Sequence, residues 1–117
     1  TRGFEEWLST LLPRTFEELE LPLVLTATNI NDGRIYYARS GDLRRALRAT
    51  TAYPGVIEPV RIGGATLVDG GLLNQIPVDG ALLHGVRRVL AVNATPLSVI
   101  DHPGDEGVVG GYCVRKL

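Results

Sequence analysis

Short apolar runs that alternate with helical patterns constrain the fold of this 117-residue chain more than any other feature. Four runs are rich in Val, Ile, Leu, Thr or Tyr and are bounded by turn-forming residues, as strands are. They cover residues 21–29, 34–38, 60–62 and 65–68. Apolar residues also recur at helical spacing over residues 4–12 and 43–51. The sequence therefore predicts an α/β fold.

Two tight turns are predicted where residues that tolerate positive φ separate neighbouring runs. Asn31-Asp32-Gly33 lies between the first two runs, and this spacing predicts a β-hairpin. Gly63-Gly64 lies between the third and fourth runs and predicts a second reversal of the chain.

Capping signals set the expected helix ends. Thr15 and Glu18 have the spacing of a capping box, which predicts a short helical turn. Asp42 supplies a capping side chain for the helix that follows it. In the first helical pattern, the aromatic residues Phe4 and Trp7 are expected in the core.

A crossover unit is predicted in the second half of the chain. Residues 65–68, 77–83 and 88–93 follow one another as strand, short helix and strand. In a βαβ unit the two strands are parallel, so Asp69 and Asn93 would end neighbouring strands at the same edge. We therefore expect a mostly parallel sheet with flanking helices.

Composition limits the class of protein. With 12 basic and 13 acidic residues the formal net charge is −1, which argues against a nucleic-acid partner. The single cysteine, Cys113, excludes an internal disulfide and favours a reducing compartment. No apolar stretch approaches the length of a membrane helix. We expect one domain in the cytoplasm, with peripheral membrane contact as the alternative.

Arginines gather in two short clusters, Arg44-Arg45 with Arg48, and Arg87-Arg88. Each cluster is expected to cover one exposed face of a helix or the start of a strand. Phosphate binding is the less favoured alternative for both clusters.

Asp69-Gly70-Gly71 is the leading candidate for a functional motif. It follows the apolar run of residues 65–68, and α/β enzymes place functional groups just beyond the carboxyl ends of strands. Paired glycines also allow another backbone to approach closely. Asp-Gly is a common turn dipeptide as well, so the triplet by itself leaves a catalytic site and a simple turn as alternatives.

A nucleophile is not evident in this sequence. Its three serines, Ser9, Ser40 and Ser98, lack the flanking glycines of a G-x-S-x-G elbow and are interpreted as surface or capping residues. Thr1 at the start is a weak candidate for an N-terminal nucleophile, because a helix rather than a strand is expected directly after it.

Metal and cofactor sites are not expected. His84 and His102 are isolated, without the spacing of metal ligands, and His84 is interpreted as a residue at a helix C-terminus. Asp79 is interpreted as a charge that favours the first turn of its helix. Gly63-Gly64 and Gly110-Gly111 lack the context of a phosphate loop.

An ordered series of motifs carries more information than any one of them. The series is Leu21-Pro22-Leu23-Val24-Leu25-Thr26-Ala27-Thr28-Asn29, Asp32-Gly33-Arg34, Ser40-Gly41-Asp42-Leu43, Arg48-Ala49-Thr50-Thr51-Ala52-Tyr53-Pro54-Gly55-Val56, Glu58-Pro59-Val60, Leu67-Val68-Asp69-Gly70-Gly71-Leu72-Leu73-Asn74 and Ile76-Pro77-Val78. It resembles the second half of a patatin-like phospholipase domain, related to the α/β hydrolases. The resemblance implies that residues 1–93 are the C-terminal part of such a domain and that residues 94–117 form a tail of uncertain structure.

The resemblance also implies a chemistry. In that family the Asp of the Asp-Gly-Gly motif pairs with the serine of a G-x-S-x-G elbow, and the Ser-Asp dyad hydrolyses lipid or other carboxylic esters without a cofactor. Asp69 is thereby expected to be the catalytic aspartate, with Gly70 and Gly71 keeping side-chain bulk away from the serine. The natural ester and the oligomeric state are not specified by this sequence.

The elbow and the family's glycine-rich oxyanion loop are both missing from this sequence. The chain is therefore expected to be a fragment of a larger domain, inactive alone, that needs the N-terminal half or a partner chain to cover its apolar edges. The alternative is a non-catalytic, truncated patatin-like module used for interaction.

Overall fold

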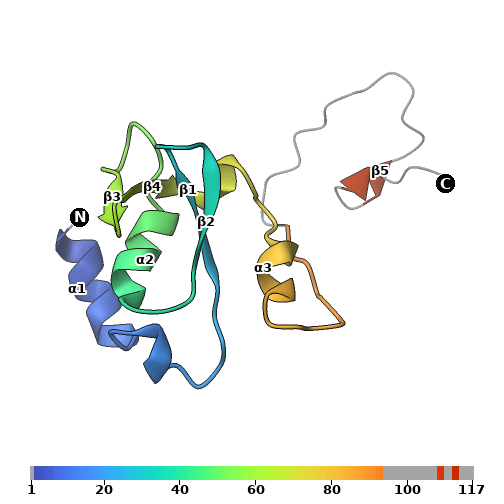
Figure 1. The fold of residues 1–117 in the computed structure, drawn as a ribbon, viewed down its shortest axis with the longest axis horizontal. Helices are drawn as coiled ribbons and strands as arrows, with labels where there is room; N and C mark the ends of the chain where they lie inside the picture. Colours follow the sequence, from blue (N-terminus) through green and yellow to red (C-terminus); the bar gives the residue numbers. More distant parts are fainter. Residues whose placement is uncertain (1, 94–107, 110–111, 114–117) are drawn as a thin grey trace.

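A four-stranded sheet organises the N-terminal three quarters of the protein (Figure 1). The computed structural model describes residues 2–93, 108–109 and 112–113. The elements are α1 (Arg2–Leu11), the 3₁₀ helix η1 (Phe16–Glu18), β1 (Leu25–Asn29), β2 (Arg34–Ala38), α2 (Leu43–Thr50), β3 (Val60–Ile62), β4 (Ala65–Asp69), the 3₁₀ helix η2 (Gly70–Leu72), α3 (Val78–Leu82), β5 (Val108–Val109) and β6 (Tyr112–Cys113). The protein is thus an α/β protein, as predicted.

The sheet is antiparallel throughout, so the prediction of a mostly parallel sheet was wrong. Its strand order is β2-β1-β4-β3, and Ala27 of β1 lies opposite Asp69 of β4. The predicted hairpin of β1 and β2 is confirmed, as is the reversal between β3 and β4. Gly63 and Gly64 both adopt positive φ, 54° and 82°, which suits a two-residue hairpin turn. Such short turns permit only antiparallel neighbours.

The predicted parallel crossover is not formed. Residues 88–93 contain no strand, and Leu90 and Val92 are 91% and 72% exposed. A strand exists only where a neighbouring backbone accepts its hydrogen bonds, and the apolar run alone does not supply that neighbour. Asp69 and Asn93 therefore do not end adjacent strands, and that prediction was wrong.

Helix α2 covers one face of the sheet and forms the core with it. Leu43 of α2 and Leu67 of β4 are fully buried. The buried residues form two clusters, Phe16, Ala38, Leu43 and Ala46, and Ala27, Ala49, Val60 and Leu67. Asp42 caps α2 as predicted, because its carboxylate accepts a hydrogen bond from the backbone N–H of Arg45 at 3.0 Å.

Helix α1 packs against α2 through one narrow face. Leu8 is buried, whereas Phe4 and Trp7 are 38% and 57% exposed, so the prediction that both aromatic residues lie in the core was wrong. Their rings contact each other instead, with centroids 6.1 Å apart. None of the helices in the described ranges is long and apolar enough to cross a bilayer.

The predicted capping box and the start of the helix after Pro77 are confirmed, whereas Arg87 and Arg88 lie on neither a helix nor a strand and the first apolar run is a strand only from Leu25. Glu18 accepts hydrogen bonds from both the backbone N–H and the hydroxyl of Thr15, each at 2.9 Å, which completes the capping box. Helix α3 begins directly after Pro77 and lies on the opposite side of the β1–β2 hairpin from α2 (Figure 1).

Candidate active site

Asp69 ends β4, one of the two central strands, and its backbone is held from both sides. Its N–H donates to the carbonyl of Ala52 at 3.0 Å, just beyond the C-terminus of α2. Its carbonyl accepts a hydrogen bond from the hydroxyl of Thr28 on β1 at 2.9 Å. The Cα of Asp69 is therefore fixed by three segments of the fold at once: β4, β1 and the end of α2.

The carboxylate of Asp69 is oriented by the turn that follows it. Oδ1 accepts the backbone N–H of Gly71 at 2.7 Å, so that Asp69 caps the 3₁₀ helix η2. This hydrogen bond holds the carboxylate in one orientation. Oδ2 receives no hydrogen bond from residues 2–93, and the side chain is partly exposed. One oxygen is anchored and the other is available to a partner.

Gly70 is required by a close approach of two backbones. A Cβ added there would lie 2.3 Å from the carbonyl oxygen of Thr26 and 2.7 Å from its carbonyl carbon. The neighbouring Gly71 is less confined, because its added Cβ would lie 3.1 Å from Oδ1 of Asp69. The turn after β4 thus packs directly onto β1, and this close contact places the carboxylate.

Threonine hydroxyls join these segments. Thr50, in the last turn of α2, donates to the carbonyl of Thr26 at 2.6 Å. Thr26 and Thr28 are only 7% and 6% exposed. Sequence reasoning did not assign a role to Thr26 or Thr28. For Thr28 a signal was present in the sequence, because a hydroxyl in a buried strand needs a hydrogen-bond partner.

Asp79 ties the segment after η2 to the sheet. Its carboxylate accepts hydrogen bonds from the hydroxyl of Tyr37 on β2 and from Nδ2 of Asn74, the latter at 2.8 Å. The Tyr37 hydroxyl, followed by Asn74 and the backbone of Gly80, lowers the pKa of Asp79, and the same bond raises the pKa of Tyr37. Asp79 therefore does more than favour the first turn of α3.

The other candidate residues take no part in this arrangement. Ser9 donates to the carbonyl of Glu6 within α1, and Ser40 is an exposed residue before α2. His84 is exposed after α3 and lines an apolar cleft of about 350 Å³. Thr1, Ser98 and His102 lie outside the described residues. Within the described ranges, no three His, Cys, Asp or Glu side chains are grouped to hold a metal ion.

A comparison with family profiles places the chain in a known family. The profile of the patatin-like phospholipases matches residues 1–82, and the chain belongs to this family. The match ends with the last residue of α3 and includes the whole Asp69 turn.

Individual relatives share this region. An uncharacterized NTE family protein of Mycobacterium tuberculosis is 36% identical over 80 residues, which cover 68% of this chain and 22% of that protein. A lysophospholipase NTE1 of Mycosarcoma maydis is 35% identical over 77 residues, which cover 66% of this chain and 4% of that protein. A lysophospholipase NTE1 of Cryptococcus neoformans is 30% identical over 77 residues, 66% of this chain and 5% of that protein. The matched region is thus a small part of each relative.

Proposed function

We propose that the protein containing this chain is a lipid acyl hydrolase in which Asp69 is the catalytic aspartate of a Ser-Asp dyad. The observation that most directly supports this proposal is the geometry of the Asp69 carboxylate. Its Oδ1 accepts the Gly71 N–H, and its Oδ2 accepts no hydrogen bond from residues 2–93. The patatin-like family and the relatives named lysophospholipases support a lipid ester as the substrate. The nucleophilic serine is supplied by a segment outside these 117 residues.

In the proposed reaction, Asp69 moves a proton between serine, leaving group and water. Oδ2 accepts the serine proton as the serine oxygen attacks the ester carbonyl carbon. The tetrahedral intermediate collapses, the alcohol leaves with that proton, and an acyl-serine forms. Water then attacks the acyl carbon and gives a proton to Asp69, which returns it to the serine as the carboxylic acid leaves. The Gly71 N–H holds the carboxylate in one orientation throughout.

The isolated chain is proposed to be inactive because catalytic groups of this kind act as a unit. A general base without a nucleophile or oxyanion donors loses nearly all of the rate enhancement. We propose residues 1–93 as the patatin-like part and residues 94–117 as a separate tail; the family match over residues 1–82 supports the first of these two parts.

A non-catalytic interaction module is the second candidate, and exposed apolar side chains favour it. Leu72 and Leu73, in the turn after Asp69, are 50% and 49% exposed, and Leu82 on α3 is 56% exposed. An exposed apolar surface of this kind is typical of a site that binds another protein segment. In the hydrolase proposal, the segment that carries the serine provides this cover.

Labelling with a fluorophosphonate distinguishes the two candidates. The full-length parent protein is expected to be labelled on one serine in a G-x-S-x-G sequence outside residues 1–117, with the site mapped by mass spectrometry. The 117-residue chain is expected to remain unlabelled. A parent that is unlabelled and does not cleave esters would leave only the interaction module, and labelling within the 117 residues would contradict the proposed position of the nucleophile.

A further inference from the structure

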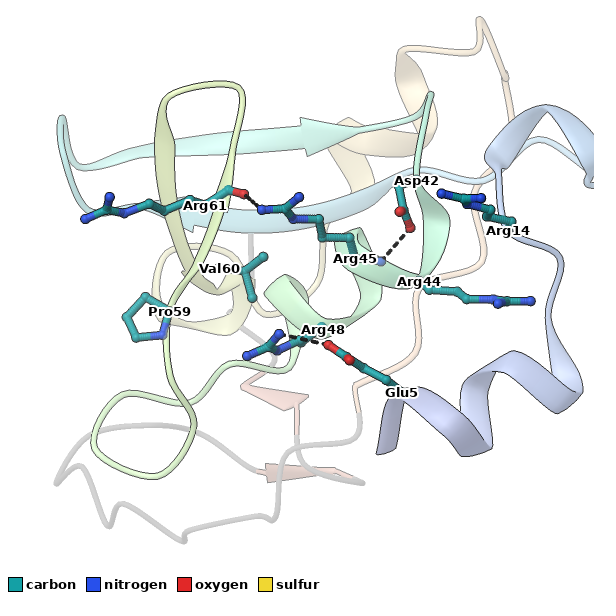
Figure 2. A pocket seen from close by; sticks show the side chains of 9 residues that line it. All are labelled: Glu5, Arg14, Asp42, Arg44, Arg45, Arg48, Pro59, Val60 and Arg61. Carbon is teal, nitrogen blue, oxygen red and sulfur yellow. Dashed lines mark hydrogen bonds and ion pairs between the residues drawn. The ribbon is translucent and has the colours of Figure 1, made fainter. Parts of the chain in front are cut away.

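A strongly basic cleft of about 540 Å³ lies across the outer face of α2. Its charged lining consists of Arg14, Arg44, Arg45, Arg48, Arg61, Glu5 and Asp42. Figure 2 shows Arg45 and Arg61 on the β3 side of α2, and Arg14 with Arg44 on the other side. None of these residues belongs to the Asp69 turn.

The two acids do not neutralise the cleft. Oε1 of Glu5 lies 2.8 Å from Nη1 of Arg48, so the negative charge of Glu5 is paired with this one arginine. Oδ1 of Asp42 accepts the backbone N–H of Arg45 as the cap of α2. Five arginines against two acids leave an excess of three positive charges in a chain whose overall formal charge is −1. The basic character is therefore local to this face.

Neutral backbone carbonyls hold two of the guanidinium groups in place. Nη2 of Arg44 donates to the carbonyls of Ser9 and Leu12 at 3.2 and 2.9 Å. Nη2 of Arg45 donates to the carbonyl of Arg61 at 2.6 Å. These bonds fix the side chains without removing their charge, so the groups are ordered before any anion arrives.

Several donors in the cleft still lack an acceptor. Nε of Arg44 and Nε of Arg48 are buried and have no hydrogen-bond partner among the described residues. The side chains of Arg14 and Arg61 make no hydrogen bond or ion pair within residues 2–93. Arg14 and Arg61 are exposed, so their guanidinium groups can donate to the oxygens of a ligand that enters the cleft.

We propose that this cleft binds a phosphate group. Guanidinium groups match the tetrahedral oxygens of phosphate with paired hydrogen bonds, and the excess positive charge of the cleft attracts its negative charge. The phosphate is that of a lipid headgroup or of a soluble phosphate compound, and both have the same chemistry at the cleft. The proposal is independent of the Ser-Asp dyad, since it uses a different face and no residue of the Asp69 turn.

The test compares two double variants of the full-length parent protein. Arg14→Gln with Arg61→Gln removes two cleft arginines that hold no other residue through their side chains. Arg34→Gln with Arg39→Gln, two exposed arginines outside the cleft lining, changes the net charge equally. Binding is measured by co-sedimentation with phosphatidylcholine vesicles, with and without phosphatidic acid, and by calorimetric titration with inorganic phosphate and pyrophosphate.

The cleft variant is expected to bind about tenfold more weakly, and the matched control to bind like wild type. If the cleft variant loses binding only to the vesicles that contain phosphatidic acid, the bound phosphate is that of a lipid headgroup. Loss confined to the soluble phosphates would identify a soluble compound. No binding to any of the probes, or an equal loss in the two double variants, would overturn the proposal. Hydrolysis of a short soluble ester, followed in parallel, is expected to stay unchanged in both variants.

Discussion

Gly70→Ala probes how the Asp69 turn is built. The added methyl carbon would lie 2.3 Å from the Thr26 carbonyl oxygen, whereas real Cβ atoms essentially never come closer than 3.0 Å to another heavy atom. The turn must therefore move away from β1 by about 0.7 Å or more, and forced overpacking of this kind costs about 1–3 kcal/mol. Thr26 cannot withdraw easily, because Thr50 holds its carbonyl at 2.6 Å and β1 is paired on both sides. We expect a loss near the upper end of that range.

Urea unfolding followed by circular dichroism measures this loss. Gly80→Ala is the matched control, since its added Cβ would lie 3.6 Å from Val24, an ordinary contact, and α3 gains a better helix former. The control is expected to be neutral or slightly stabilising. If Gly70→Ala destabilises the protein no more than Gly80→Ala, the close approach of η2 to β1 is not present as described.

Three further changes test the supports of the site and the ends of its helices. Thr28→Val removes the hydrogen bond to the Asp69 carbonyl and is expected to cost about 1–3 kcal/mol in urea unfolding, while Thr28→Ser retains most of the stability. The lowered pKa of Asp79 adds stability above the carboxyl's unfolded pKa of about 4 that is lost as the pH falls through its folded pKa. The melting temperature of Tyr37→Phe should therefore fall less steeply with decreasing pH than that of wild type. An unchanged slope would contradict this linkage. Asp42→Ala is expected to cost about 1 kcal/mol and Asp42→Asn much less, as measured by urea unfolding, because only the alanine removes the cap of α2.

Features set by a few neighbouring residues were predictable from the sequence. The capping box of Thr15 and Glu18 and the turn at Gly63-Gly64 depend on local hydrogen bonds and backbone freedom, and both are found where expected. The position of Asp69 at the end of a strand was also predicted. These features need no knowledge of distant segments.

Features set by distant contacts were not predictable in the same way. Whether β4 pairs with β1 or with residues 88–93 depends on which backbones meet, and the apolar pattern of β4 suits either neighbour. The roles of Thr26 and Thr28 likewise follow from a contact between β1 and the Asp69 turn, whose residues are about forty positions apart. The exposure of Trp7 depends on how much of α1 other segments cover.

The most direct test of the account is the turnover of Asp69→Asn in the full-length parent protein with a short-chain ester. Asparagine keeps an oxygen that can accept the Gly71 N–H, so the turn is retained while the proton acceptor is removed. The matched control is Asp32→Asn, in an exposed turn where asparagine can also accept the Arg34 N–H. We predict a fall in kcat of about 10²–10⁴-fold for Asp69→Asn, with unchanged thermal stability and a fully active control. Near-normal turnover of Asp69→Asn would contradict the assignment of Asp69 as the catalytic aspartate.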